Sequence, residues 1–125
     1  MDVSEIHWTR NKICSYVLKL EGDASREAYY WVGYSCDLEK RILQHLGKAP
    51  GGAKFTALHK PVEILQVRIH ETTAEAMAME TALWNFYAAK LNDYDAVRGG
   101  RYNCTTDLRY PPRGWNPVQE NQTQE

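Results

Sequence analysis

The sequence lacks any long hydrophobic run, and this absence excludes one class of protein at the outset. None of its apolar stretches approaches the roughly 20 residues that a membrane-spanning helix needs. Residues 1–6 are polar and acidic, so they do not resemble a secretory signal. A length of 125 residues fits one domain with a modest core. We therefore expect a single cytoplasmic domain without a membrane partner.

Cysteine is also scarce. The three cysteines, Cys14, Cys36 and Cys104, lie far apart and form no Cys-x-x-Cys pair. An odd number of distant cysteines argues against a disulfide framework and against a zinc site. The phosphate-loop, zinc-protease and serine-hydrolase motifs are absent as well. A thiol nucleophile built from Cys14 or Cys36 with His45 has nothing to orient it.

The sequence has no large excess of positive or negative charge, since its formal net charge is −1. This counts mildly against a polyanionic partner, but phosphate contacts need only a local basic surface. Residues 40–60 contain five lysines and arginines and no acid, and residues 98–113 contain four arginines against Asp107 alone. These clusters are either phosphate-binding surfaces or parts of a mixed, solvated surface.

Two strand patterns stand near the start of the chain. Residues 16–20 alternate in polarity, and residues 28–34 are rich in aromatic and β-branched types. The segment between them, residues 21–27, contains Gly22 and Asp23, which are typical of a hairpin loop. Residues 1–12 show no periodicity and predict a loosely ordered terminus, with a packed arm as the alternative.

A helix is predicted over residues 36–47, with Asp37 or Ser35 as its cap. Apolar residues recur every fourth position from Leu38 and form one stripe. Arg41 and His45 lie one turn apart on the flank of this stripe, so both can face one groove.

The following residues, 48–61, form a basic loop rich in Gly and Pro, with one helical turn near residues 55–58. Such loops often carry substrate contacts on a rigid scaffold, although ordinary loop polarity is the alternative. The candidates for phosphate contacts are Lys54, Thr56, His59 and Lys60. A third strand is predicted over residues 62–69.

The longest helix is predicted over residues 73–91, after a capping box formed by Thr72 and Glu75. Its expected apolar stripe comprises Ala76, Met79, Leu83, Phe86, Tyr87 and Leu91. Glu80 falls inside this stripe. A carboxylate on a buried face is costly unless it is paired or binds a cation. Glu80 is therefore either a metal ligand or the partner of an arginine at the core edge.

In this order, the features resemble the GIY-YIG nuclease superfamily. Cys14-Ser15-Tyr16 retains the tyrosine of the first signature, and Trp31-Val32-Gly33 has tryptophan in place of the second tyrosine. Leu38-x-x-Arg41-x-x-x-His45 and the helix with Glu80 follow. The resemblance covers about residues 13–103. It implies an α+β fold, with a three-stranded, mainly antiparallel sheet flanked by helices in one domain over residues 1–110. Residues 111–125 end as a polar segment, which predicts a partly disordered tail.

The resemblance also implies a function: a divalent-metal-dependent DNA endonuclease that hydrolyses phosphodiester bonds, one strand per active site. Glu80 would bind Mg²⁺ or Mn²⁺, and Arg41 would bind the phosphate. Tyr16 is the leading general base, with Tyr30 and Tyr34 behind it. His45 would position water, share the base role or orient the phosphate. Gly33, Arg98 and Asn103 join the loop residues Lys54, Thr56, His59 and Lys60 as predicted substrate contacts.

Other interpretations stay open at this point. The replaced signature residues favour a catalytically weak or silent module that binds nucleic acid or protein on the same scaffold. RNA is an alternative substrate, because phosphate chemistry is shared and no base-reading element is visible. Cutting both strands would need a dimer, a second protein or two encounters. Similar stand-alone domains are bacterial or phage-encoded, which fits a cytoplasmic location.

Overall fold

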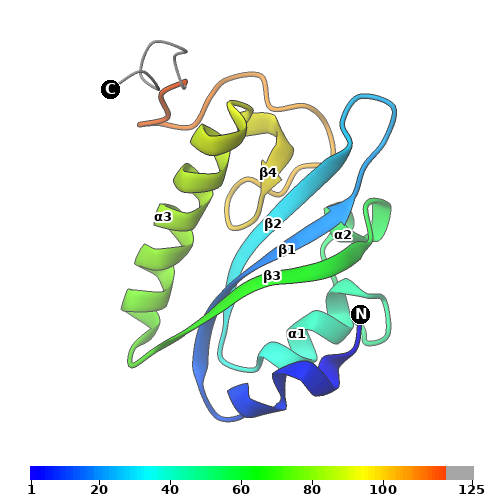
Figure 1. Cartoon of the computed structure of the whole chain (residues 1–125), viewed down its shortest axis with the longest axis vertical. Helices are drawn as coiled ribbons and strands as arrows, with labels where there is room; N and C mark the ends of the chain where they lie inside the picture. Colours follow the sequence, from blue (N-terminus) through cyan, green and yellow to red (C-terminus); the bar gives the residue numbers. More distant parts are fainter. Residues whose placement is uncertain (118–125) are drawn as a thin grey trace.

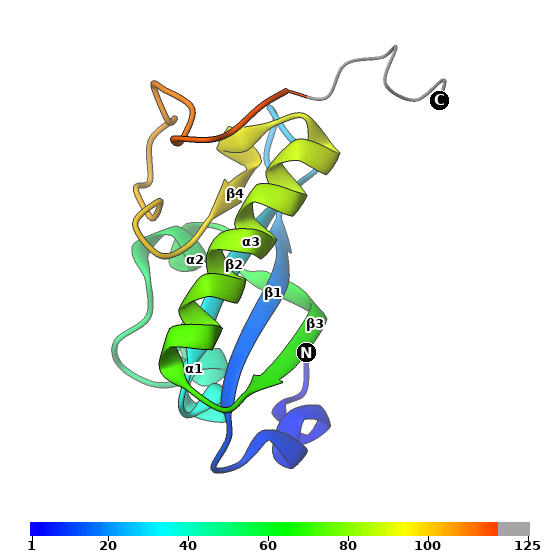
Figure 2. The same ribbon diagram turned by 90° about the vertical axis from the view of Figure 1, so that its left-hand side faces the viewer.

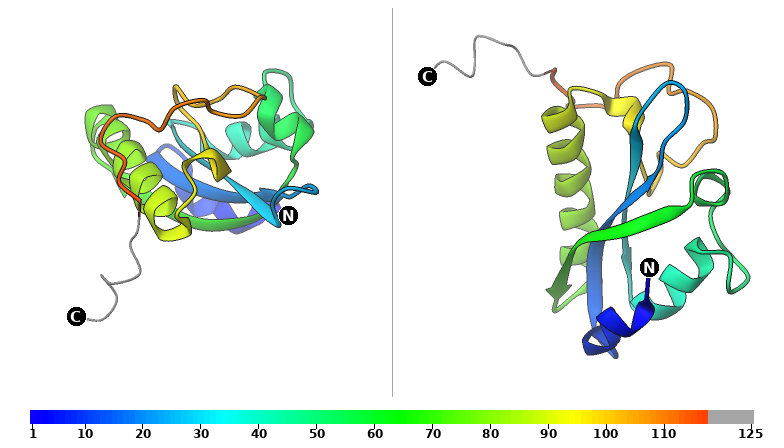
Figure 3. Two further views of the ribbon diagram at one scale, coloured as in Figure 1. Left: turned by 90° about the horizontal axis from the view of Figure 1, so that it is seen from above. Right: turned by 45° about the vertical axis from the view of Figure 1, so that its right-hand side comes forward.

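The computed structural model describes residues 1–117 and shows one mixed sheet between two layers of helices. The strand order is β3-β1-β2-β4 (Figure 1). The long helix α3, Thr73–Leu91, covers one face of the sheet, and Figure 2 shows it running along that face. The shorter helices α1, Leu38–His45, and α2, Lys54–Leu58, lie on the other side (Figure 3). The predicted α+β class is confirmed.

The sheet has four strands in place of the predicted three. Strands β1, Ile13–Glu21, β2, Ala28–Ser35, and β3, Pro61–His70, form the antiparallel core of the sheet. The fourth strand, β4, contains only Val97–Arg98 and pairs parallel to β2. A two-residue strand has no periodicity, which is why the sequence pattern did not predict it.

The central strand β1 is buried on both faces, and its alternation separates two hydrophobic clusters. Tyr16 and Leu18 point into the cluster beneath α1 and α2, together with Trp31. Val17 points into the cluster beneath α3, together with Val32. Across the β1–β2 pair, Tyr16 lies opposite Gly33. The register therefore decides which side chains of these two strands share a face.

The predicted helix caps are confirmed, although α1 begins two residues later than predicted, at Leu38. The Asp37 side chain accepts a hydrogen bond from the backbone N–H of Lys40 and caps α1. The Thr72 side chain accepts from the N–H of Glu75 and caps α3. The predicted turn near residues 55–58 is α2, which begins one residue earlier. Each side chain satisfies a backbone donor that the first helical turn leaves unpaired.

The buried face of α3 differs from the predicted stripe. Phe86 is 55% exposed and Leu91 39% exposed, whereas Trp84, absent from the predicted stripe, is buried. The indole N–H of Trp84 donates to the carbonyl of Val97, so the helix is rotated toward β4. Glu80 lies one turn before Trp84 and remains on the sheet side of the helix, as predicted.

The N-terminal segment is ordered, so the prediction of a loosely ordered terminus is wrong. Residues Val3–Thr9 form the 3₁₀ helix η1, which lies beside α1 (Figures 1 and 3). Ile6 is buried, and His7 and Arg10 both contact the carboxylate of Glu39 in α1. One apolar anchor and a pair of polar contacts thus hold the arm on the domain.

The residues after α3 contain a short 3₁₀ helix, η2, Tyr94–Ala96, then β4 and an irregular loop. The Trp115 ring packs against Tyr94 with their centroids 5.0 Å apart. Much of the tail predicted over residues 111–125 lies outside the described residues, from residue 118 onward. In residues 1–117, no helix combines the length and hydrophobicity that crossing a membrane requires.

The structure corrects the expected position of Arg98. Its side chain is buried, 1% exposed, and donates to the Asp95 carboxylate at 2.9 Å. It also donates to the carbonyls of Cys104, at 3.2 Å, and Thr106, at 3.1 Å. These contacts tie the loop after β4 to the domain, so the guanidinium is not a solvent-exposed phosphate ligand.

Replacing Arg98 with alanine should destabilise the protein strongly, because the buried Asp95 carboxylate would lose its partner at 2.9 Å and keep only the longer contact to Arg26, at 3.4 Å. We expect the free energy of unfolding to fall by about 3–5 kcal/mol. The neighbouring Arg101 is exposed. The substitution Arg101→Ala should change the free energy of unfolding by no more than about 0.5 kcal/mol. Urea denaturation of the two variants measures both values. Equal midpoints for the two would contradict the structural role of Arg98.

Candidate active site

A hollow of about 270 Å³ lies at the open edge of β2, where residues from both helical layers meet. Strand β4 pairs only with Tyr30 and Trp31, so among the described residues this edge of β2 has no paired strand beyond Trp31. Side chains of α1 and α3 can therefore approach each other around this edge. The hollow is lined by Tyr16, Trp31, Gly33, Tyr34, Arg41, Gly51, Ala53, Glu80, Gly100 and Asn103.

Tyr16 stands at the floor of this hollow and is 1% exposed. Its hydroxyl lies 2.9 Å from Nε2 of His45. Burial raises the pKa of Tyr16 to about 12, while the charge of Arg41 and hydrogen bonds from Trp31 and Arg41 act in the opposite direction. At neutral pH Tyr16 is thus a protonated phenol that is hydrogen-bonded to His45.

Gly33 makes room for this phenol. A Cβ atom at position 33 would lie 2.7 Å from the Tyr16 hydroxyl oxygen and 2.8 Å from Cζ. The tyrosine tip thus lies directly against the β2 backbone, and a side chain there would displace it. Gly33 is required here for space.

His45 is the inner partner of Tyr16 and is only 2% exposed. Its Nδ1 lies 3.0 Å from the Thr56 hydroxyl, and the Trp31 ring packs on its edge at 5.1 Å. Burial, followed by the nearby charge of Arg41, lowers the pKa of His45 to about 3. The imidazole is therefore neutral. It is hydrogen-bonded to the phenol and does not line the hollow of about 270 Å³.

Arg41 is held in position before any ligand binds. Its Nη1 donates to the Gln44 side chain and to the carbonyl of Gly51, each at 3.0 Å. The Gln44 amide in turn donates to the carbonyl of Pro50 at 3.0 Å. A Cβ at Gly52 would lie 2.3 Å from the Gln44 carbonyl oxygen, so the loop packs closely on α1. The guanidinium thus has a fixed position beside Tyr16.

Glu80 reaches the hollow from α3. It is half-buried, and this burial raises the pKa of its carboxyl group. Within residues 1–117 the carboxylate has neither a hydrogen-bond nor an ion-pair partner, and the buried Arg98 pairs with Asp95. A Cβ at Gly100 would lie 2.9 Å from Oε1 of Glu80. The described residues contain no cluster of three or more His, Cys, Asp or Glu side chains that could hold a metal.

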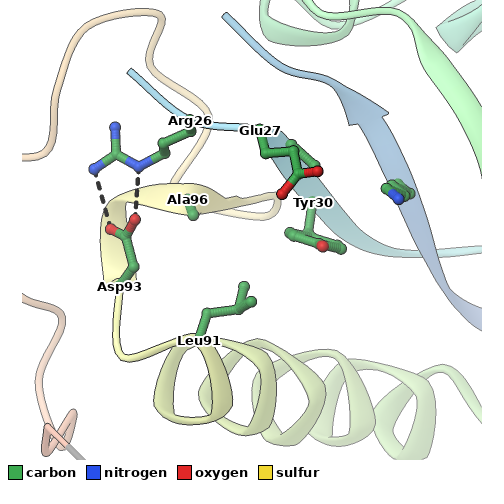
Figure 4. Close-up of a pocket in the computed structure, with 8 residues that line it drawn as sticks. Arg26, Glu27, Tyr30, Leu91, Asp93 and Ala96 are labelled. Carbon is green, nitrogen blue, oxygen red and sulfur yellow. Dashed lines mark hydrogen bonds and ion pairs between the residues drawn. The ribbon is translucent and has the colours of Figure 1, made fainter. Parts of the chain in front are cut away.

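Tyr30 does not join this group, because it lies on the opposite face of the sheet. Its ring stacks on Tyr87 with centroids 5.9 Å apart. It lines a separate hollow of about 300 Å³ beside the Arg26–Asp93 ion pair (Figure 4). Residues 16 and 30 are on opposite faces because their strands pair in the observed register. Tyr34 was predicted, like Tyr30, as an alternative general base. It lines the same hollow as Tyr16.

Some of the residues predicted to contact phosphate are exposed in hollows, and others are packed inside the domain. Lys54 and Lys60 are exposed and line a hollow of about 390 Å³ beside α2. Thr56 is fully buried, so it is not placed to touch a phosphate. His59 packs its ring against Tyr29, at 4.4 Å, and Phe55, at 4.7 Å. Asn103 is exposed and lines the hollow of Tyr16.

Sequence reasoning missed the part that Trp31 plays. The indole lowers the pKa of Tyr16 and its ring packs on His45, so it lies beside both residues. The only signal was the tryptophan in a signature position. Gln44 and Gly51 were also missed, since their contacts to Arg41 depend on how the loop folds back onto α1.

A buried tyrosine, a fixed arginine and a glutamate without a partner in residues 1–117 surround one open hollow. The family model of the GIY-YIG catalytic domain matches residues 12–95. The chain is 30% identical over 94 residues to UPF0213 protein BH0048 of Halalkalibacterium halodurans, covering 74% of this chain and 94% of that protein. It is 31% identical over 65 residues to UPF0213 protein SSP2268 of Staphylococcus saprophyticus, covering 52% and 77% respectively.

The chain therefore belongs to the GIY-YIG family, and through it to the nuclease superfamily that the order of the motifs predicted. Neither relative's name states an activity. No solved structure matches the chain.

The buried neutral His45 predicts a specific dependence of stability on pH. Because its pKa is about 3 in the folded protein and about 6.5 in the unfolded chain, the unfolded state binds an extra proton between these values. Stability should therefore fall as pH falls through this window, by at most about 1.4 kcal/mol per pH unit from this residue. The His45→Gln variant lacks this pH-dependent contribution to stability.

Urea denaturation at pH 7.5, 6.0 and 5.0 tests this expectation. The difference in unfolding free energy between wild type and His45→Gln should shrink as the pH falls. A difference that stays constant across this range would mean that His45 is not held in its neutral form.

Proposed function

We propose that this protein is a divalent-metal-dependent DNA endonuclease that hydrolyses one phosphodiester bond per active site. The observation that supports the proposal is the convergence of Tyr16, Arg41 and Glu80, from β1, α1 and α3, on one open hollow. Each contributes a different requirement of the reaction: a proton acceptor, a fixed cation and a metal ligand. Asn103 lines the same hollow and is proposed as a substrate contact.

Tyr16 acts as the general base in this scheme. A water molecule attacks phosphorus and gives its proton to the Tyr16 oxygen as that oxygen passes its own proton to Nε2 of His45, 2.9 Å away. The bond between phosphorus and the leaving sugar oxygen breaks, and that oxygen takes up a proton from solvent. Proton transfer to His45 avoids a free phenolate, which burial of Tyr16 disfavours. Burial also disfavours the imidazolium that forms, so His45 holds the proton only briefly and releases it before the next turnover.

Arg41 stabilises the negative charge that develops on the phosphoryl oxygens. Its guanidinium presents planar donors that match phosphate geometry, and it stays charged at every physiological pH. The contacts to Gln44 and Gly51 fix it beforehand, so little reorganisation is needed during the reaction.

Glu80 is the proposed ligand for Mg²⁺ or Mn²⁺. Its carboxylate is half-buried and unpaired within the described residues, which suits a cation that takes one or two protein carboxylates and completes its shell with water and phosphate oxygens. Such an ion, when bound, neutralises phosphoryl charge and stabilises the leaving oxygen.

The surroundings of the hollow suit a polyanion. Lys54 and Lys60 lie on the α2 side. Arg101 and Arg113 line a neighbouring hollow of about 340 Å³ that shares Glu80 with the active site. We take DNA as the substrate and the cytoplasm as the location, where the three unpaired cysteines would stay reduced. A double-strand break would require two copies or two successive encounters.

A plasmid-nicking assay with Mg²⁺ or Mn²⁺ tests the proposal. Glu80→Gln and Arg41→Ala should each lower the nicking rate by about 100-fold or more, because each removes stabilisation of the transition state. Glu63→Gln and Lys40→Ala are matched controls at exposed positions, and they should retain wild-type activity. Chelation with EDTA should abolish nicking.

Three outcomes would contradict parts of this proposal. Wild-type activity in Glu80→Gln and Arg41→Ala would reject the site. No nicking by the wild type, with retained DNA binding, would favour the silent binding module. Cleavage of a single-stranded RNA of matched sequence in preference to DNA would reassign the substrate.

A further inference from the structure

A buried chain of hydrogen bonds leads inward from the active site. Tyr16 contacts Nε2 of His45 at 2.9 Å, and Nδ1 of His45 contacts the Thr56 hydroxyl at 3.0 Å. The Thr56 hydroxyl contacts the carbonyl of Ala53 at 3.0 Å. All three side chains are almost completely buried, so water does not replace any of these contacts. The direction of each bond can therefore be worked out from the partners.

The Ala53 end of the chain fixes the proton on Nδ1. A carbonyl oxygen can only accept, so the single hydroxyl proton of Thr56 is used in the bond to Ala53. The Thr56 oxygen must then accept from His45, and Nδ1 carries the proton. Because His45 is neutral, its Nε2 has no proton and can only accept.

The Tyr16 end of the chain agrees with this assignment. Nε2 of His45 is the hydrogen-bond partner of the Tyr16 hydroxyl, at 2.9 Å. Trp31 and Arg41 also lie close enough to lower the pKa of Tyr16, but an indole N–H and a guanidinium cannot accept a proton. The phenol proton therefore points to Nε2 of His45.

We propose that Thr56, anchored by the Ala53 carbonyl, is a positioning residue that fixes the tautomer of His45 and so keeps Nε2 free to take the Tyr16 proton. Its catalytic consequence rests on the proposed function, whereas the tautomer itself does not. This role replaces the phosphate contact that the sequence predicted for Thr56. It also explains why a threonine hydroxyl is buried in α2 beside the only imidazole within hydrogen-bonding distance of Tyr16 among the described residues.

Nuclear magnetic resonance of protein with ¹⁵N-labelled histidine tests the tautomer directly. His45→Gln identifies the His45 signals among the four histidines. In wild type at pH 7.5, Nδ1 should carry the proton and Nε2 should not. In Thr56→Val, which keeps the shape of the side chain but removes the acceptor, the pure Nδ1–H form should be lost. Thr56→Ser keeps the hydroxyl and should restore it.

Nicking kinetics test the consequence for catalysis. Thr56→Val should lower kcat by roughly 10–100-fold with little change in KM, and Thr56→Ser should recover most of this loss. Thr9→Val is the matched control, because Thr9 is also buried and donates to the carbonyl of Ile6 but does not line the hollow. It should leave kcat and the His45 tautomer unchanged.

The two measurements separate the possible failures. A wild-type His45 with its proton on Nε2 overturns the inference whatever the nuclease activity. A Thr56→Val variant with the wild-type tautomer and kcat also overturns it. The predicted change of tautomer in a wild-type protein that shows no nicking supports the positioning role and rejects the proposed function instead.

Discussion

The arrangement depends on one close approach, the Tyr16 phenol against the backbone of Gly33. The antiparallel register of β1 and β2 places these residues opposite each other, and the missing side chain at Gly33 lets the ring tip reach His45. Because side chains alternate along a strand, a slip of one residue would move Tyr16 to the face beneath α3. Burial of β1 on both faces makes such a slip costly, so the core of the domain also protects the geometry of the site.

The short length of β4 is the second constraint. If β4 continued along β2, it would close the edge that the active-site hollow occupies, and α3 would be separated from α1 by a complete sheet. Pairing ends at Trp31, and Gly99 then approaches β2 so closely that a Cβ there would lie 1.8 Å from the Val32 carbonyl oxygen. Glu80 and Arg41 can therefore face each other although their helices cover opposite sides of the sheet.

Local patterns in the sequence predicted the structural features that are determined by residues close together in the chain. Capping, alternation and apolar spacing indicated the main strands and helices, and a carboxylate in an apolar stripe singled out Glu80. The burial of Arg98 and Thr56 was not predictable in this way, because their partners belong to the loop after β4 and to the end of α1. Phe86 was misplaced for a related reason: Trp84 bonds to β4, a strand too short to leave a pattern, and this contact sets the rotation of α3.

The tryptophan in the second signature changes which groups can take part in the proposed proton transfer. An indole N–H donates and has no lone pair to accept a proton, so Trp31 cannot act as a base. It lies close enough to Tyr16 to lower the pKa of the phenol, whose hydrogen-bond partner is Nε2 of His45. A second tyrosine at this position would offer another ionisable group, whereas tryptophan leaves Tyr16 and His45 as the proton path. The altered signature is thus consistent with a working site that has one base, and it does not by itself indicate a silent module.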